Sequence, residues 1–274
     1  MGAVKGHVVS EEVLPGEGLD YAKMPGHWLL AQMGKKVLRP GGLELTKKML
    51  SALRITSRDD VVEFAPGLGV TARTVLAKNP ASFVGIERDE SAAAIVQKYL
   101  VGPNQRCVVG RSEETPLGDG VASVVYGEAM LTMQTNAGKA KIVREAFRIL
   151  KPGGRYGIHE ISLEPDGLSE AKKDEISRDL KESIRVGARP LTAQEWRELL
   201  EREGFEVQSC TTVPMALLEP QRMLRDEGVR GVAKILLNIA KNPAARRRVL
   251  KMRASFQKHA GNMSAISIVA VRCS

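Results

Sequence analysis

The sequence predicts an α/β fold in which helices cover both faces of a mostly parallel sheet. Between residues 61 and 163, short apolar segments of strand length alternate with longer segments of helical periodicity. This alternation is typical of parallel strands that are joined by right-handed helical crossovers. After residue 204, two more apolar segments of strand length flank a basic stretch. They predict a C-terminal antiparallel strand pair and a sheet of seven strands in total.

Length and composition agree with this fold and exclude several other classes. The 274 residues are 43% hydrophobic and 27% charged, which is typical of a globular domain and not of a disordered chain. No apolar run approaches the ~18 residues of a membrane-spanning helix. The first residues lack the apolar segment of a signal peptide, so we expect a cytoplasmic protein. Cys107, Cys210 and Cys273 lie far apart, which predicts reduced thiols and no metal site.

Each expected strand is a short apolar run that ends at polar or turn-forming residues. The strands are expected at 61–65, 83–87, 106–109, 121–126, 155–163, 205–213 and 265–272. Each expected helix has apolar residues at intervals of three or four. The helices are expected at 27–37, 43–53, 71–78, 90–99, 139–150, 168–186 and 193–203. Thr192 and Glu195 have the spacing of a capping box at the start of the last of these.

The order of these segments divides the chain into four parts. Residues 1–42 form an irregular N-terminal segment that Pro-Gly pairs interrupt. Residues 43–213 form a core, residues 214–261 a basic helical insert, and residues 262–274 the last strand of the core sheet. Within the insert, apolar residues recur at helical spacing on both sides of Pro243, which predicts two helices.

Most of the positive charge lies in the insert. The formal net charge of the chain is +9, and residues 214–261 contain eleven basic and three acidic side chains. Two interpretations are open: solvated helix faces, or a surface for an anionic partner such as an acidic substrate, nucleic acid or membrane headgroups. Few aromatic side chains accompany the charges. This disfavours a platform for single-stranded nucleic acid, which needs rings for base stacking.

The most informative motif is a strand, a glycine turn and a helix at residues 61–72. Gly67, Gly69 and Ala72 match the spacing G-x-G-x-x-A, which lets a cofactor approach the backbone at a helix start. Glu87 ends the next strand, twenty residues after Gly67, where an acid can bind the ribose of an adenosine cofactor. The pattern predicts a Rossmann-like fold, and by itself it fits both a nicotinamide dinucleotide and S-adenosylmethionine.

Glu63 favours S-adenosylmethionine. A carboxylate inside the first strand would repel a pyrophosphate, whereas it would attract an ammonium and a sulfonium group. The loop after the third strand adds Ser112 and Glu113, where an adenine edge could rest.

With these motifs the chain resembles the class I S-adenosylmethionine-dependent methyltransferases over residues 43–205. Residues 63–69 are similar to the family's acidic-x-Gly-x-Gly-x-Gly motif, with Ala65 in place of the first glycine, and the Lys-Pro-Gly-Gly turn at 151–154 is also similar. Arg111 departs from the Asp often found in the adenine loop. The resemblance implies S-adenosylhomocysteine as the product and a set of cofactor-binding residues. They are Glu63, Ala65, Gly67, Gly69, Glu87, Arg88, Arg111, Ser112, Glu113 and Glu128.

The resemblance also implies that the segment before the first strand covers the substrate, with Tyr21, His27 and Trp28 as candidate contacts. Arg39 could reach the carboxylate of the cofactor, or could be a surface charge. Methyl transfer is an in-line displacement that depends on alignment. It needs a general base only if the nucleophile arrives protonated.

Three residues near strand ends are candidate catalytic groups: Glu128, His159 and Glu160. For each, a structural role is the alternative. Strand alternation places His159 and Glu160 on opposite faces of the sheet.

The sequence therefore predicts a methyltransferase acting on a small molecule, with O-methylation of an acidic or apolar metabolite as the first expectation. Methylation of RNA or protein through the basic insert is an alternative that the sequence does not favour. A nicotinamide-dependent oxidoreductase is less favoured still, because of Glu63. A cofactor-binding module without catalysis also remains open. No spacing of His or Cys predicts a metal site.

Overall fold

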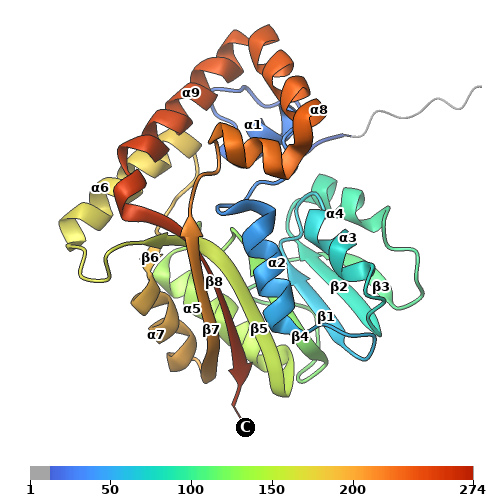
Figure 1. The fold of residues 1–274 in the computed structure, drawn as a ribbon. Helices are drawn as coiled ribbons and strands as arrows, with labels where there is room; N and C mark the ends of the chain where they lie inside the picture. The colour runs from blue at the N-terminus through green and yellow to red at the C-terminus, as the bar shows by residue number, and fades with distance from the viewer. Residues whose placement is uncertain (1–12, 274) are drawn as a thin grey trace, which may run out of the picture.

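The computed structural model describes residues 13–273 and shows the expected α/β sheet (Figure 1). The sheet has eight strands in the order β3-β2-β1-β4-β5-β8-β7, and β6 pairs with the end of β5. The strands are β1 Asp60–Phe64, β2 Ser82–Glu87, β3 Gln105–Val109, β4 Ala122–Glu128, β5 Leu150–Leu163, β6 Leu191–Thr192, β7 Phe205–Pro214 and β8 Met263–Arg272. Seven of them are the predicted strands. The additional strand, β6, is a two-residue pairing that has no periodicity to reveal it.

Nine helices connect or cap the strands in the described part of the chain. They are α1 Gly26–Gln32, α2 Gly42–Leu53, α3 Val70–Leu76, α4 Glu90–Gln97, α5 Asn136–Ile149, α6 Glu170–Ile184, α7 Ala193–Arg202, α8 Pro220–Lys241 and α9 Pro243–Lys258. The capping box of Thr192 and Glu195 is present at the start of α7. Helix α1 ends five residues before the expected boundary, because Gly34 takes a φ of 99° and turns the chain out of the helix.

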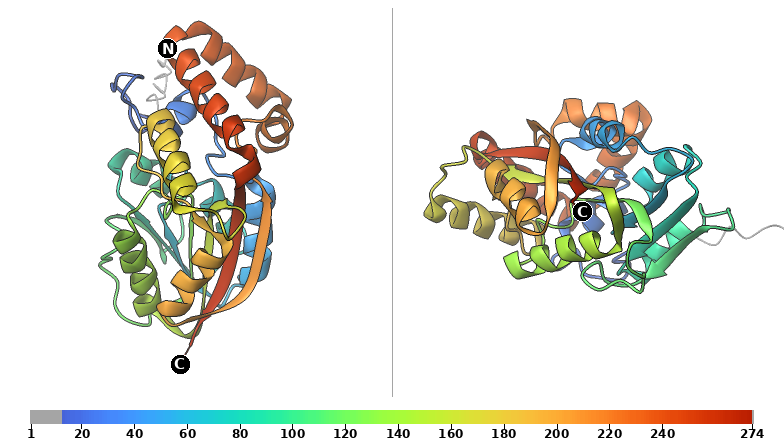
Figure 2. Two further views of the ribbon diagram at one scale, coloured as in Figure 1. Left: turned by 90° about the vertical axis from the view of Figure 1, so that its left-hand side faces the viewer. Right: turned by 90° about the horizontal axis from the view of Figure 1, so that it is seen from below.

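Helices cover both faces of the sheet (Figure 2). Helices α5 and α7 pack on one face, where Phe64, Ile142 and Trp196 belong to one buried apolar cluster. Helices α2, α3 and α4 cover the other face around residues such as Leu50 and Val75. Strands β1 to β5 are parallel, and β8 runs antiparallel to both β5 and β7. The predicted C-terminal antiparallel pair is therefore confirmed.

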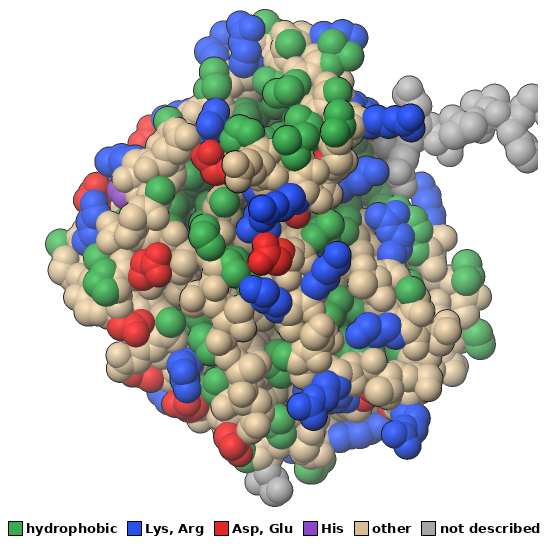
Figure 3. Space-filling view, in the orientation of Figure 1, with side chains coloured by type: hydrophobic (Ala, Val, Ile, Leu, Met, Phe, Trp, Pro, Cys, Tyr) green, Lys and Arg blue, Asp and Glu red, His purple; other side chains and the backbone are tan. Residues whose placement is uncertain are grey.

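Helices α1, α6, α8 and α9 form a cap over the carboxyl ends of the parallel strands (Figure 1). Apolar side chains such as Leu30 of α1 and Met252 of α9 hold the cap together. The basic insert forms two helices on either side of Pro243, as predicted, and α8 kinks at Gly228, whose φ is 69°. Hydrophobic side chains among Lys and Arg side chains gather over this end of the molecule (Figure 3). In residues 13–273, no helix combines the length and the apolar character that crossing a membrane requires.

Candidate active site

A cavity of about 480 Å³ lies where the parallel strands β1, β2 and β4 end. Ligands of open parallel sheets bind at this edge. Strand ends and the glycine loop line the cavity from below, and α1 and residues 36–39 line it from the cap. Apolar side chains form much of the remaining wall, among them Trp28, Leu38, Met130, Met133 and Val186. The cavity thus joins the core and the N-terminal segment in one site.

The glycine loop presents bare backbone to this cavity. Gly67 has a φ of 57°, and a Cβ added there would meet nothing within 4 Å, so a ligand can approach the loop closely. Ala65 also lines the cavity and has a φ of 52°, a left-handed conformation that glycine adopts without strain. Gly69 caps α3 away from the cavity, and a Cβ there would lie 3.3 Å from Tyr99 and Val96. Its contacts are those of packing.

Three carboxylates with buried side chains meet in the cavity, one from each of β1, β2 and β4: Glu63, Glu87 and Glu128. Burial raises the pKa of Glu63 to about 8, and its Oε2 has no hydrogen-bond partner among the described residues. Glu87 accepts hydrogen bonds from the N–H groups of Gly67 at 2.9 Å and Asp89 at 3.0 Å. Burial raises the pKa of Glu87, although these hydrogen bonds act to lower it. Three acids in one cavity favour a cationic ligand over a pyrophosphate.

Glu128 is held by four neighbours. Its Oε1 accepts hydrogen bonds from Thr46 Oγ1 at 2.5 Å and from His159 Nδ1 at 2.8 Å. Its Oε2 accepts one from Thr71, and Arg39 Nε lies 3.4 Å from Oε1. Burial alone would raise its pKa, but Arg39 and the hydrogen bonds overcome burial and lower the pKa to about 2. Glu128 is therefore a fixed carboxylate with little capacity to accept a proton near neutral pH.

His159 lies behind Glu128 and is fully buried. Its Nδ1 faces Glu128, and its Nε2 lies 2.5 Å from the carbonyl oxygen of Pro40. A carboxylate and a carbonyl can only accept hydrogen bonds, so each ring nitrogen faces an acceptor. The ring positions Glu128 and the Pro40 turn. Its own nitrogens are both occupied and do not reach the cavity.

Glu160 points to the other face of the sheet and is also fully buried. It accepts hydrogen bonds from the N–H groups of Met130, Leu131 and Thr132 at 2.9, 2.7 and 3.0 Å, and from Thr132 Oγ1 at 2.7 Å. These bonds fix the loop after β4, which carries Met130 and Met133 into the cavity wall. Of the three candidate catalytic residues, the structure brings only Glu128 to the cavity.

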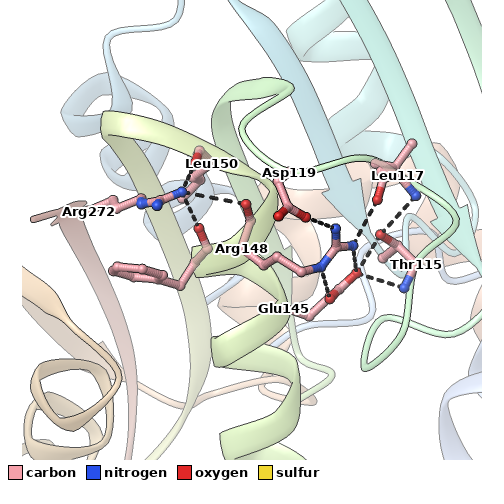
Figure 4. Close-up of polar contacts among 8 residues, drawn as sticks. Thr115, Leu117, Asp119, Glu145, Arg148, Leu150 and Arg272 are labelled. Atoms are coloured by element: carbon pink, nitrogen blue, oxygen red, sulfur yellow. Dashed lines mark hydrogen bonds and ion pairs between the residues drawn. The ribbon is translucent and has the colours of Figure 1, made fainter. Parts of the chain in front are cut away.

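The predicted adenine loop also lines the cavity, through Arg111, Ser112 and Glu113. The loop is fastened to α5 by residues that lie outside the cavity (Figure 4). Thr115 donates to Glu145 Oε1 from its N–H at 2.7 Å and from its Oγ1 at 2.6 Å. Arg148 binds the same carboxylate and also donates to the Leu117 carbonyl at 2.8 Å. Because α5 belongs to the core, these bonds hold the loop in place without a ligand.

The N-terminal segment contributes two of its three candidate contacts. His27 and Trp28 line the cavity, and their ring centroids lie 4.5 Å apart. Burial and, to a lesser extent, Arg88 lower the pKa of His27 to about 4, so the ring is neutral. Tyr21 packs in the cap instead, and its carbonyl accepts a 2.6 Å hydrogen bond from Arg248. Residues 1–12 of the expected covering segment lie outside the described residues.

Arg39 lines the cavity, which is one of the two placements that the sequence left open. Its Nη2 is buried and has no hydrogen-bond partner among residues 13–273, while its Nε donates to Thr46 at 2.8 Å. Sequence reasoning missed Thr46, the Pro40 carbonyl and Val186, because segments far apart in the chain bring them together. Met130 could have been found, since it follows the candidate catalytic residue Glu128 by two residues.

Comparisons with known proteins identify a methyltransferase domain in this chain. Residues 61–154 match the family described as methyltransferase domain. An uncharacterised protein of Haemophilus influenzae is 31% identical over 220 residues, which cover 79% of this chain and 86% of that protein. An uncharacterised methyltransferase of Synechocystis is 29% identical over 136 residues, which cover 49% of this chain and 63% of that protein.

A solved structure shows the same fold. Phosphoethanolamine N-methyltransferase 2 of Haemonchus contortus, in complex with S-adenosyl-L-methionine, has a TM-score of 0.69 at 16% identity, over 91% of this chain and 57% of that chain. The strand order, the family match and the fold of this neighbour point the same way. The chain belongs to the class I S-adenosylmethionine-dependent methyltransferases, enzymes whose cofactor is S-adenosylmethionine.

Proposed function

We propose that this enzyme methylates a small acceptor of acidic or apolar character. The observation that carries the proposal is the composition of the cavity. The carboxylates at the strand ends suit the cationic cofactor, whereas apolar side chains together with Lys36 and Arg39 line the side toward the cap, where the acceptor would lie. When bound, S-adenosylmethionine supplies an electrophilic methyl group on a sulfonium. The chain's own task is to orient the two reactants and to exclude water.

The residues present fit the cofactor. Glu63 Oε2 and Arg39 Nη2 are buried polar atoms, and neither has a hydrogen-bond partner among the described residues. We propose that Glu63 binds the ammonium group and that Arg39 binds the carboxylate of the methionine end. Glu87 and Arg88 would bind the ribose, and the adenine would lie against the 111–113 loop. The open space at Gly67 would admit the cofactor to the backbone.

We propose that the acceptor brings an unprotonated nucleophile, such as a carboxylate. Glu128 is a fully bonded carboxylate with a pKa of about 2, and His27 is a neutral ring with a pKa of about 4. Neither is suited to remove a proton near neutral pH. On this reading Glu128, His159 and Glu160 are positioning residues: the first two hold Arg39 and the Pro40 turn, and the third holds the loop after β4.

The cap supports a small acceptor over RNA or protein. Helix α1 and residues 36–39 lie over the cavity, which restricts the approach of a macromolecule. The Haemonchus contortus neighbour is also named for a small acceptor. A cytoplasmic location remains a prediction.

Titration calorimetry tests the cofactor, and transfer of labelled methyl groups then tests the acceptor. The purified protein should bind S-adenosylmethionine and S-adenosylhomocysteine, but not NADH. A panel of small carboxylic acids should contain acceptors whose turnover changes little between low and moderate salt, whereas apolar hydroxyl compounds, which arrive protonated, should react poorly. Methylation of RNA or protein with a steep loss in salt would overturn the small-acceptor proposal.

A further inference from the structure

Helix α8 consists of two halves with different surroundings, separated by the kink at Gly228. The first half is anchored to the N-terminal segment by its acids. Asp226 Oδ1 accepts a hydrogen bond from the N–H of Leu43 at 3.0 Å, and Glu227 Oε1 accepts one from the N–H of Val37 at 2.9 Å. In the second half, residues 229–241, only Ile235 is buried. Most of that half therefore faces outward.

The second half carries an exposed apolar stripe. Val229, Leu236 and Leu237 are 76%, 57% and 54% exposed. Together with Ala233 and Ala240 they recur at intervals of three and four, which places them along one side of the helix. Val232, Ile235 and Ile239 recur in the same way along a different side, and among them Ile235 is buried against the cap. The helix thus has a second apolar side that no described residue covers.

Cations without partners accompany this stripe. Arg230, Lys234 and Lys241 are exposed on the same half of α8, and Arg246 and Arg247 are exposed at the start of α9 near Leu250, which is 57% exposed. None of these five cations forms an ion pair with any of residues 13–273. The more distal cations of α9 do form ion pairs, for example Lys251 with Glu182. Figure 3 shows hydrophobic and basic side chains intermixed at this end of the molecule.

We propose that residues 229–250 dock on an anionic lipid surface. An exposed apolar stripe bordered by unpaired Lys and Arg is the composition of helices that lie in the headgroup region of a bilayer. A second copy of the chain would bring two patches of the same charge together, which disfavours a dimer through this surface. RNA is disfavoured because residues 229–250 contain no aromatic side chain for base stacking.

Docking would bring the segment that lies over the active site, residues 33–43, close to the lipid. Besides the contacts of Asp226 and Glu227, Asn238 Nδ2 donates to the carbonyl of Met33 at 3.1 Å. Residues 33–43 therefore connect α8 to Leu38 and Arg39, which line the cavity. The proposal concerns only the surface, so it holds whatever the acceptor proves to be.

Co-sedimentation of the full-length protein with vesicles tests the proposal. Phosphatidylcholine vesicles with and without phosphatidylglycerol are compared at low and moderate salt. We expect binding to the anionic vesicles only, and weaker binding at the higher salt. The double variant Arg230→Gln/Lys234→Gln should bind about 30-fold more weakly, and Leu236→Ser/Leu237→Ser about tenfold or more.

A matched control is Lys47→Gln/Arg58→Gln, which removes two exposed cations outside residues 229–250 and should bind as the parent does. Unchanged affinity for S-adenosylmethionine and an unchanged circular dichroism spectrum show that each variant is folded. Equal binding to neutral vesicles, no effect of either insert variant, or no binding at all would overturn the proposal. So would a dimer in light scattering that Leu236→Ser/Leu237→Ser dissociates, or RNA binding in place of vesicle binding.

Discussion

His159 and Glu128 form one buried unit, with Nδ1 of the ring 2.8 Å from Oε1 of the carboxylate. The two residues face each other across β4 and β5, where they are register partners. On the far side of the ring, the Pro40 carbonyl lies 2.5 Å from Nε2. The pair therefore links the strand ends to the turn that precedes α2, and the position of Arg39 depends on it.

Replacing His159 should destabilise the protein strongly. His159→Phe removes the hydrogen bond from Nδ1 to the buried Glu128 carboxylate and should cost about 1.5–3 kcal/mol of unfolding free energy. Denaturant unfolding at pH 7 measures the loss. His159→Asn keeps one donor and should recover part of the stability. If His159 were instead a general base, both variants would lose turnover with little loss of stability.

Glu128 should contribute to acid sensitivity. Its pKa is about 2 in the folded protein, below the value of about 4.3 in an unfolded chain. The stabilisation is complete above the unfolded value and is lost as the pH falls through about 2. In Glu128→Gln, the unfolding free energy should fall less between pH 4.5 and pH 2.5 than in the parent. Denaturant midpoints across that range give the comparison, and parallel curves would contradict the assignment.

Cofactor binding should release a proton from Glu63. Its pKa of about 8 in the ligand-free protein leaves it mostly protonated at pH 7, and a nearby cation would ionise it. Calorimetric titrations with S-adenosylmethionine at pH 7, in buffers of different ionisation enthalpy, should show release of nearly one proton. Glu63→Gln should abolish the release and weaken binding. A proton count of zero in the parent would exclude Glu63 as the partner of the ammonium group.

The same residue should lower the stability of the ligand-free protein at alkaline pH. A carboxyl whose folded pKa is raised binds more protons when folded, so its contribution to stability falls as the pH rises from about 4.3 to about 8. Glu63→Gln removes this penalty. We expect Glu63→Gln to be more stable than the parent at pH 8.5 and closer to it at pH 5.5, as measured by thermal or denaturant unfolding.

Ala65→Gly should stabilise the fold. Ala65 has a φ of 52°, where an L-residue costs roughly 1–2 kcal/mol and glycine does not. After the entropy that glycine loses on folding, a gain of up to about 1 kcal/mol remains. Ala77 has a φ of −63° at the end of α3, so Ala77→Gly is the matched control and should lose stability. Denaturant unfolding of both variants decides between strain relief and a general effect of glycine.

Glu145→Ala should weaken cofactor binding, although Glu145 itself lies outside the cavity. The substitution removes the acceptor of both Thr115 hydrogen bonds and so releases the adenine loop. We expect the Kd for S-adenosylhomocysteine to rise several-fold, and hydrogen exchange of residues 110–119 to accelerate. Arg144 lies on α5 like Glu145, but it forms an ion pair with Glu203 instead. Arg144→Ala should therefore change neither quantity.

The sheet and the part of the cavity that the glycine loop lines could be predicted because their signals are local. Alternating apolar segments predicted seven strands, and Glu63, Gly67 and Glu87 are defined by their spacing around two strand ends. The surroundings of His159 and Glu160 could not be predicted. The Pro40 carbonyl and the N–H groups of residues 130–132 are supplied by segments far away in the sequence. Tyr21 could not be placed for the same reason. The sequence does not show whether an aromatic residue in this segment faces the cavity or packs in the cap, as Tyr21 does.

Pro214 at the end of β7 pairs with Ser264 at the start of β8, so the whole helical insert leaves and re-enters the sheet at one rung of the ladder. The length and shape of the insert can therefore vary without any shift in strand register. Helices α8 and α9 could therefore be remodelled, and with them the proposed docking surface, without changing any residue that lines the cavity. The docking surface and the active site would then evolve in separate parts of one chain.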